Sequence, residues 1–317
     1  MSFDLYIPPN SNFTSDWNAK IVWPIRTSTF GEIDGFVQLP SNKQLELPDG
    51  SNNNGIVRLD MQTNVSATGN ASAYLVPAEG VTVVSDVDDV LRVTRIYQPQ
   101  EGLLNTFARP FRAWLNMPAI YAAWSTQHPD EPYHFHYLTT TPQPATRLYE
   151  DFVYNNYPLG SFDTRPYNFS DLSATFAIRE SLLRKVIETF PQRRFVLVGD
   201  TSNSDVMKDY PQMMRDYQNV QCILMRNTSA TDEMKLPYDT GEFERLPKNK
   251  YMFFRTPDDL VGLDLGNGDC RNSSVPDMTN FGWHLGLTGF DQGSGAGRVQ
   301  VVLWGVVVGM VVGLYLL

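Results

Sequence analysis

Apolar runs in the middle of the chain end in polar residues that suit phosphoryl transfer. The first run, VTVVSD, ends at Asp86 and is followed by Asp88. In such a pair one carboxylate attacks phosphorus, and the other protonates the leaving oxygen and later activates water. Two carboxylates this close are costly to desolvate, and a divalent cation usually offsets their repulsion. An Asp-x-Asp pair by itself also suits an acidic turn or a helix cap.

A hydroxyl cluster, TTTP over residues 139–142, ends the second run, FHYLT. A helix N-terminus favours an anion because its first backbone N–H groups lack partners. We therefore predict that Thr139, directly at the strand end, binds phosphate. For Thr140 and Thr141 the sequence favours ordinary capping of the following helix.

The third run, RFVLVGD over residues 194–200, ends at Asp200, and Asp205 follows along a turn that Gly199 opens. Carboxylate oxygens suit the ligation of Mg²⁺. In an open α/β sheet the ligand site lies outside the carboxyl ends of the strands, so these residues should converge with those of the first run. The predicted magnesium ligands are Asp86, Asp88, Asp200 and Asp205.

An amphipathic helix is predicted over residues 178–190, with its apolar side against the sheet. The helix runs antiparallel to the strand that it feeds, so its N-terminus lies at the same edge as the carboxylates. Arg179 is in its first turn and in line with the apolar side, whereas Lys185 lies ~9 Å farther along the axis on the polar side. We predict that Arg179 faces the phosphate, with a plain surface salt bridge as an equal alternative.

The arrangement of the runs predicts an α/β fold with a doubly wound parallel sheet. Strands that are apolar throughout and alternate with helices indicate a parallel sheet covered on both faces. Residues 1–80 instead hold short β-like runs between turn signals, which predicts a small β-rich N-terminal module. The α/β domain is predicted over residues 81–265, followed by a Gly/Ser/Asn-rich stalk over residues 266–298.

The last residues, 299–317, form an uncharged apolar segment, VQVVLWGVVVGMVVGLYLL. As a helix rising ~1.5 Å per residue, this segment is long enough to cross the hydrocarbon core of a bilayer. We predict either a single transmembrane helix or a glycolipid-anchor signal, and the sequence leaves that choice open. Gly305, Gly309 and Gly313 form a small-residue stripe that suits a helix-mediated dimer.

Charge and glycosylation motifs indicate the kind of environment. The net charge of −10 and the absence of a basic stripe exclude nucleic acid as a partner. An excess of Asn-x-Ser/Thr sequons favours a secretory route. The sequons begin at Asn12, Asn64, Asn70, Asn168, Asn227 and Asn272.

The two cysteines, Cys222 and Cys270, suit one disulfide in an oxidising compartment, or two isolated buried thiols. The N-terminus lacks the basic and apolar regions of a signal peptide, so we predict that such a segment is missing or removed. The predicted location is membrane-anchored, in the secretory pathway or at the cell surface.

These motifs resemble a known family when they are taken together. Asp-x-Asp-x-Val at 86–90, Thr139, a basic residue and Gly-Asp followed by Asp205 resemble the haloacid-dehalogenase-like superfamily in order and spacing. More closely, four segments within about residues 81–262 resemble the catalytic domain of the fungal actin-patch-type phosphatidate phosphatases. These segments are VSDVDDVLRVT, FHYLTTTP, TFPQRRFVLVGD and MFFRTPDDL.

The resemblance implies magnesium-dependent removal of phosphate from phosphatidic acid or a related lipid phosphate. It makes Asp86 the nucleophile, Asp88 the general acid and base, and Asp200 a metal ligand. Arg165 resembles a family arginine that contacts the substrate head group, or it pairs with Asp163. Two alternatives are the same mechanism on a soluble phosphate ester, and a non-catalytic cell-surface or adhesion protein that retains a phosphatase fold.

Some positions depart from the family pattern. Val90 stands where Thr is commoner, and Arg179 stands where Lys is usual. Gly-Asp-Thr-Ser-Asn at 199–203 replaces Gly-Asp-Ser-Gly-Glu. The nucleophile and the metal ligands are retained, so these departures bear on the substrate rather than on the mechanism.

Overall fold

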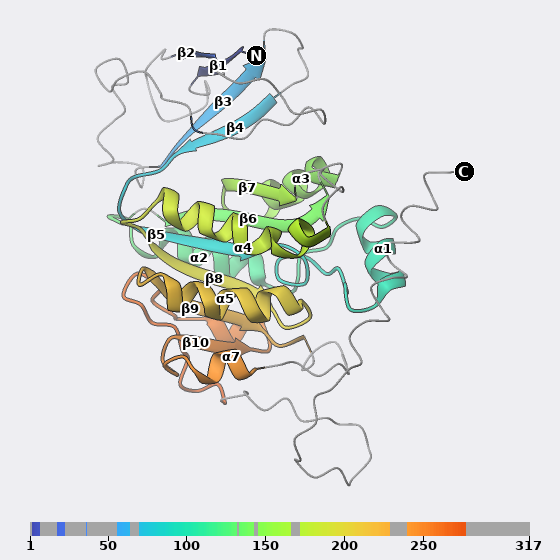
Figure 1. Cartoon of the computed structure of the whole chain (residues 1–317), viewed down its shortest axis with the longest axis vertical. Helices are drawn as coiled ribbons and strands as arrows, with labels where there is room; N and C mark the ends of the chain where they lie inside the picture. Colours follow the sequence, from blue (N-terminus) through green and yellow to red (C-terminus); the bar gives the residue numbers. More distant parts are fainter. Residues whose placement is uncertain are drawn as a thin grey trace.

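The computed structural model describes residues 2–6, 18–22, 36, 56–63, 70–131, 133–142, 145–165, 172–228 and 240–276. Within them, the N-terminal residues form a small antiparallel sheet in the order β2-β1-β3-β4 (Figure 1). Its strands are β1 (Ser2–Tyr6), β2 (Asn18–Val22), β3 (Val57–Thr63) and β4 (Asn70–Leu75). The described strands agree with the β-rich module predicted for residues 1–80.

A parallel sheet forms the centre of the larger domain, in the order β10-β9-β8-β5-β6-β7. Its strands are β5 (Val81–Asp86), β6 (Tyr133–Pro142), β7 (Gly160–Arg165), β8 (Arg194–Asp200), β9 (Val220–Arg226) and β10 (Tyr251–Phe254). The chain extends the sheet to one side of β5 through β6 and β7, then returns to β8 on the other side. The carboxyl ends of β5 and β8 therefore flank the topological switch point, where open α/β sheets bind ligands.

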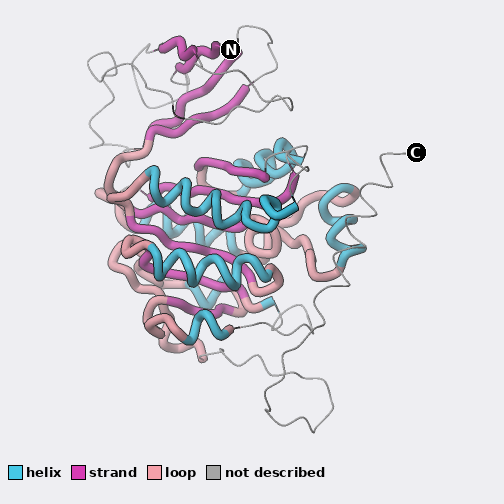
Figure 2. Tube along the Cα trace, viewed as in Figure 1, coloured by secondary structure: helices cyan, strands magenta, loops and turns pink. Residues whose placement is uncertain are grey.

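Helices cover both faces of this sheet, as expected for strands that are apolar throughout (Figure 2). One face packs against α4 (Leu172–Thr189), α5 (Ser204–Asp216) and α7 (Gly241–Glu244), and the other against α2 (Met117–Gln127) and α3 (Thr146–Asn156). The short helix α1 (Pro99–Phe107) lies outside this layer, and a 3-10 turn, η2, spans Pro257–Leu260. The predicted doubly wound α/β architecture is confirmed.

Two predicted elements differ from the structure. Strand β6 continues to Pro142, so Thr140 and Thr141 belong to a strand, and the prediction that they cap a helix is wrong. The next helix begins only at Thr146. Helix α4 begins at Leu172 rather than near residue 178, so Arg179 is not in its first turn.

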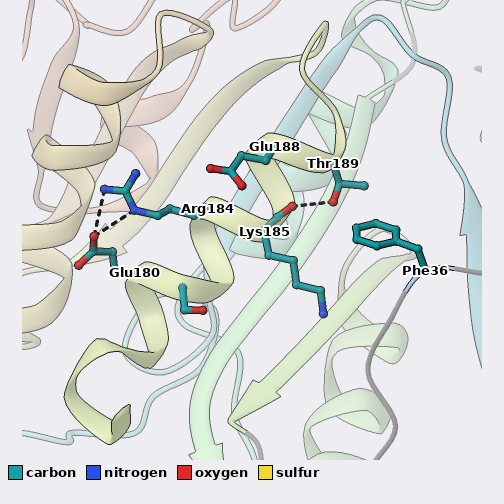
Figure 3. Close-up of a pocket in the computed structure, with 7 residues that line it drawn as sticks. Phe36, Glu180, Arg184, Lys185, Glu188 and Thr189 are labelled. Carbon is teal, nitrogen blue, oxygen red and sulfur yellow. Dashed lines mark hydrogen bonds and ion pairs between the residues drawn. The ribbon is translucent and has the colours of Figure 1, made fainter. Parts of the chain in front are cut away.

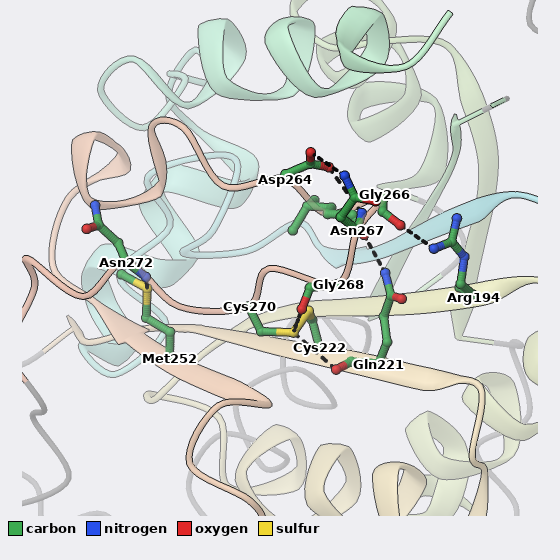
Figure 4. The surroundings of a disulfide bond; sticks show 11 residues. Arg194, Gln221, Cys222, Met252, Asp264, Gly266, Asn267, Gly268, Cys270 and Asn272 are labelled. Carbon is green, nitrogen blue, oxygen red and sulfur yellow. Dashed lines mark hydrogen bonds between the residues drawn. A yellow bond between two sulfur atoms is a disulfide. The ribbon is translucent and has the colours of Figure 1, made fainter. Parts of the chain in front are cut away.

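A disulfide joins Cys222 on β9 to Cys270, with the two Cα atoms 5.2 Å apart (Figure 4). Leu265, Cys270 and Val275 are buried in the same core as β5. The folded domain thus continues past the predicted boundary at residue 265, because the disulfide and these apolar side chains hold the first part of the predicted stalk against the sheet.

The predicted membrane segment and most of the predicted stalk, residues 277–317, lie outside the described residues. Among the residues that the structure describes, no helix is long and apolar enough to span a bilayer. Of the sequons, Asn227 is fully buried, so a glycan on its side chain is incompatible with the folded domain.

Candidate active site

Three neighbouring strands bring the predicted catalytic residues to one edge of the parallel sheet. β5 ends at Asp86, with β8 and its terminal Asp200 on one side. On the other side of β5, Asp86 is in register with Leu138 of β6, so Thr139 lies just beyond it. The convergence predicted from the apolar runs is therefore present in the fold.

The side chain of Asp86 is buried and forms an ion pair with Arg179 on α4. The Oδ2 atom of Asp86 lies 2.9 Å from Nη2 of Arg179, and Oδ1 accepts a hydrogen bond of 2.8 Å from the backbone N–H of Val87. Arg179 is itself buried, and its Nε and Nη1 atoms have no hydrogen-bond partner among the described residues. A buried guanidinium with two uncommitted donors beside a carboxylate is suited to an oxyanion such as phosphate.

Asp88 is held by four hydroxyl groups. Its Oδ1 accepts hydrogen bonds from Thr94 at 2.7 Å and from Tyr149 at 2.8 Å. Its Oδ2 accepts from Thr139 at 3.0 Å and from Thr141 at 3.2 Å. Thr139, predicted to bind phosphate, thus contacts Asp88, the predicted general acid and base.

Asp89 organises the loop that follows β5. Its backbone has φ 55°, in the left-handed region that Asp tolerates better than most residues. The buried carboxylate accepts backbone hydrogen bonds from Thr94 at 3.0 Å, Arg95 at 2.6 Å and Ile96 at 2.8 Å. The guanidinium of Arg226 donates to the Asp89 carbonyl. This third aspartate of the motif therefore fixes the loop rather than facing the site.

Burial shifts the acidities of the site in one direction. The pKa of Asp86 is raised to about 6. Burial is the main cause, Arg179 opposes the shift, and the charge of Asp88 adds to it. For Asp200, burial followed by the charges of Asp86 and Asp89 raises the pKa to about 8. The Ser202 backbone N–H, 2.7 Å from Asp200 Oδ1, opposes this shift. The charged forms of these two carboxyls are therefore disfavoured between β5 and β8 unless a cation lies beside them.

The predicted four-carboxylate magnesium site is not assembled in the described residues. No group of three or more Asp, Glu, His or Cys side chains there is arranged to hold a metal ion. The reason is that Asp86 pairs with Arg179, while both oxygens of Asp88 accept from hydroxyls. The donor chemistry of Asp86 and Asp200 nevertheless fits Mg²⁺, which commonly uses one or two carboxylates and retains several water molecules.

Two further predicted site residues, Asp205 and Arg165, lie on α5 and β7. Asp205 is in the first turn of α5, where its backbone N–H donates to the Asn203 side chain at 3.0 Å, and burial raises its pKa. Arg165 ends β7, but its side chain is outside the described residues.

Lys185 is exposed on the outer side of α4, as predicted. It lines an open hollow of about 870 Å³ together with Phe36 and polar residues of α4 (Figure 3). This hollow lies on the opposite side of the helix from the buried Arg179.

Sequence reasoning missed the residues that surround Asp88. Thr94 lies close by in sequence, but Tyr149 is 61 residues away on α3, and Arg92 approaches Asp88 Oδ1 through its Nε atom at 3.5 Å. Thr141 was visible only as part of a hydroxyl cluster. No sequence spacing links a tyrosine on a helix to an aspartate in the loop after a distant strand. The contact between Tyr149 and Asp88 is therefore visible only in the folded structure.

A family model matches the part of the chain that contains this site. Residues 81–227 match the family model described as "Phosphatidate phosphatase APP1, catalytic domain". The match ends at Asn227, just past β9, and contains Asp86, Asp88, Thr139, Arg179, Asp200 and Asp205. It confirms the predicted resemblance to the phosphatidate phosphatase catalytic domain.

Among curated proteins, a segment is 24% identical over 139 residues to "Phosphatidate phosphatase APP1" of Saccharomyces cerevisiae. The alignment covers 42% of this chain and 24% of the yeast protein, so the chain matches about a quarter of its relative's length. Among solved structures, one described as "Structure of Pnkp1/Rnl/Hen1 complex" aligns with a TM-score of 0.32 and 14% identity over 46% of each chain. That likeness is too low to carry an argument.

Tyr149→Phe tests whether the hydroxyl cluster positions Asp88 for proton transfer. The aromatic ring would keep its edge contact with Phe111, whose centroid is 5.2 Å away, while Asp88 loses one of two donors to Oδ1. We expect kcat to fall by ~10-fold or more for alkyl phosphates, which need a protonated leaving group, and by less for p-nitrophenyl phosphate. Steady-state kinetics on both esters measure the ratio.

Tyr154→Phe is the matched control, because Tyr154 lies on the same helix and its hydroxyl donates to the Gly160 carbonyl at 3.1 Å, away from Asp88. An equal loss for both esters in the Tyr149 variant would contradict a role in positioning the proton donor.

Proposed function

We propose that this protein is a Mg²⁺-dependent phosphohydrolase that forms a phosphoryl-aspartate on Asp86, with phosphatidic acid or a related lipid phosphate as its substrate. The observation that carries the proposal is the buried Asp86–Arg179 pair, whose arginine retains two unpartnered N–H donors. Nothing in the packing of a parallel sheet requires such a pair, whereas phosphoryl transfer requires both a nucleophile and a cation.

In the first step a carboxylate oxygen of Asp86 attacks phosphorus, and the bond from phosphorus to the ester oxygen breaks. The leaving oxygen takes a proton from Asp88. In the second step Asp88 removes a proton from water, whose oxygen attacks the same phosphorus atom and displaces Asp86. Inorganic phosphate leaves, and both aspartates return to their starting protonation states.

The chain's own residues supply three parts of this reaction. Arg179 neutralises Asp86 in the resting site, and its Nε and Nη1 groups can donate to the non-bridging oxygens of phosphate. The hydroxyls of Thr94, Tyr149 and Thr139 hold the charged form of Asp88 in place. Because a hydroxyl can also accept, rotation of any one of them leaves room for the proton that Asp88 carries.

Mg²⁺ would be held by Asp86 and Asp200, where it offsets their mutual repulsion and the charge of the phosphate. Support for the lipid substrate comes from the matched family and from its yeast relative, both described as phosphatidate phosphatase. The disulfide supports the proposed secretory or cell-surface location, where such bonds persist.

The defining test is phosphate release from phosphatidic acid and from soluble esters, with and without Mg²⁺, by wild type and by Asp86→Asn. We expect Asp86→Asn to abolish release from every ester, because an amide does not form the acyl phosphate. Circular dichroism checks that the variant is folded, since the change leaves Arg179 buried without its counterion. Turnover by a folded Asp86→Asn variant would exclude the nucleophile, and turnover of soluble esters alone would exclude the lipid substrate.

Arg179→Ala should lower kcat/KM by ~100-fold or more, the scale of losing one preorganised electrostatic contact. Arg179→Lys should recover part of the rate because it retains the charge but loses the second donor to phosphate. Lys185→Ala is the control on the exposed side of the same helix and should change kcat/KM little. If Lys185→Ala were the damaging change, the phosphate-facing cation would be wrongly assigned.

Asp200→Asn should raise the thermal stability of the metal-free protein and remove its response to Mg²⁺. The amide can still accept from Ser202, and it replaces a carboxyl whose pKa burial and the charges of Asp86 and Asp89 raise to about 8, so that folding near neutral pH no longer requires its protonation. For wild type, Mg²⁺ at ~100 times its Kd should add ~2.7 kcal/mol to the free energy of unfolding. Differential scanning calorimetry with and without Mg²⁺ measures both effects, and an equal Mg²⁺ response in the variant would rule out Asp200 as a ligand.

A further inference from the structure

The segment between the catalytic loop and α2, residues 91–115, forms an arm beside the active site. The arm contains α1, which Figure 1 shows projecting beyond the edge where β5 ends. Its base returns to the loop through a backbone hydrogen bond of 2.9 Å from Trp114 N to the Leu91 carbonyl. The arm therefore leaves the domain and rejoins it within the same loop as Asp88.

Large apolar side chains of the arm face solvent. Leu103 is 40% exposed and Phe107 is 67% exposed, and their spacing of four residues places them on one face of α1. Ile96 just before the helix is 45% exposed. An adjoining side of α1 is anchored, because Thr106 is buried and its hydroxyl accepts from Arg92 Nη2 at 3.3 Å. Contiguous exposed apolar groups of this kind mark interaction sites.

The charge of the arm is opposite to that of the protein. Residues 91–115 hold four arginines and one glutamate, a net charge of +3, in a chain whose net charge is −10. Arg92 is buried, while Arg95 and Arg112 are exposed and Arg109 pairs with Glu101 at 2.6 Å. Exposed apolar side chains flanked by arginine are the composition of segments that bind at the interface of anionic membranes.

Hydrogen bonds connect the arm to the proposed proton donor. The guanidinium of Arg92 lies 3.6 Å from the ring centroid of Phe111 and donates to the Asn105 carbonyl at 2.9 Å. Asn105 Nδ2 donates to the Thr94 carbonyl at 3.0 Å, and Thr94 in turn binds Asp88. A surface bound to α1 is therefore held in a fixed position relative to Asp88.

We propose that Ile96, Leu103 and Phe107 dock onto a bilayer that contains anionic phospholipid, with the exposed arginines of the arm against the headgroups. As an account of how the substrate reaches the site, this inference rests on the proposed lipid phosphatase function. The docking itself does not require catalysis. An anionic surface is favoured over a two-fold contact between the arms of two copies, because that contact would bring the exposed arginines of both arms together.

The test uses the full chain with a fluorophore that reports local polarity. Because Cys222 and Cys270 form a disulfide, Leu103→Cys introduces one reactive thiol for labelling. Adding vesicles of phosphatidylcholine with phosphatidylserine, an anionic lipid that is not the substrate, should shift the emission to the blue, and phosphatidylcholine alone should do so much less. A local probe is needed because the apolar residues 299–317 could bring the chain to vesicles without any contact by the arm.

Leu159→Cys carries the control label. Leu159 is 47% exposed, but it precedes β7 and so lies at the amino edge of the sheet, away from the arm. We expect no shift from this position. An equal response at both positions, or no response at position 103, would overturn the inference, as would a blue shift without vesicles that grows with protein concentration and so indicates self-association.

A second variant separates docking from chemistry. Leu103→Glu combined with Phe107→Glu should lower the rate on phosphatidic acid in vesicles by ~10-fold or more, since two apolar side chains that would enter the bilayer are replaced by charged ones. Its rate on p-nitrophenyl phosphate should match wild type. An equal loss on both substrates would contradict a docking role. If wild type released no phosphate at all but the position-103 label still shifted, the proposed function would fail and the docking surface would stand.

Discussion

The buried ion pair between Asp86 and Arg179 is the constraint on which the rest of the site depends. Placing both charges away from water is costly, and removing either partner of such a pair typically costs ~3–5 kcal/mol. The pair can form only because β5 occupies the middle of the sheet and α4 packs across it with Arg179 in line with Leu183 and Val186. The packing of α4 on the sheet thus also places the charge of Arg179 beside Asp86.

A second constraint acts on the loop after β5. The carboxylate of Asp89 accepts hydrogen bonds from three backbone N–H groups of the same loop. These bonds hold Thr94 where its hydroxyl donates to Asp88. Tyr149 reaches the same carboxylate from α3, on the opposite face of the sheet from α4. The proposed nucleophile and the proposed proton donor are therefore contacted by different helices, so each can be perturbed with limited effect on the other.

The features of the fold and the site that could be predicted from the sequence are those set by residues close together in the chain. The ends of β5 and β8 were predictable at residue level because an apolar run stops at a polar residue, and Arg179 was predictable from helical periodicity. The start of α4 and the length of β6 were not, since neither boundary has a sequence signal strong enough to override tertiary contacts. The donors to Asp88 come from Thr94, Thr141 and Tyr149, and only the folded chain brings these together.

The proposed catalytic aspartates and the proposed membrane-docking arm lie in one continuous segment of the chain. The proposed nucleophile and the proposed proton donor, the loop that fixes them and the arm with its exposed apolar face all lie between Asp86 and Leu115. Arg92 connects the two ends of this stretch, because it contacts Asp88 on one side and the carbonyl of Asn105 on the other. A displacement of α1 must therefore either break the contacts of a buried guanidinium or move the loop that holds Asp88. Since the first is costly, the proposed contact at the arm would act on the position of Asp88, the proposed proton donor.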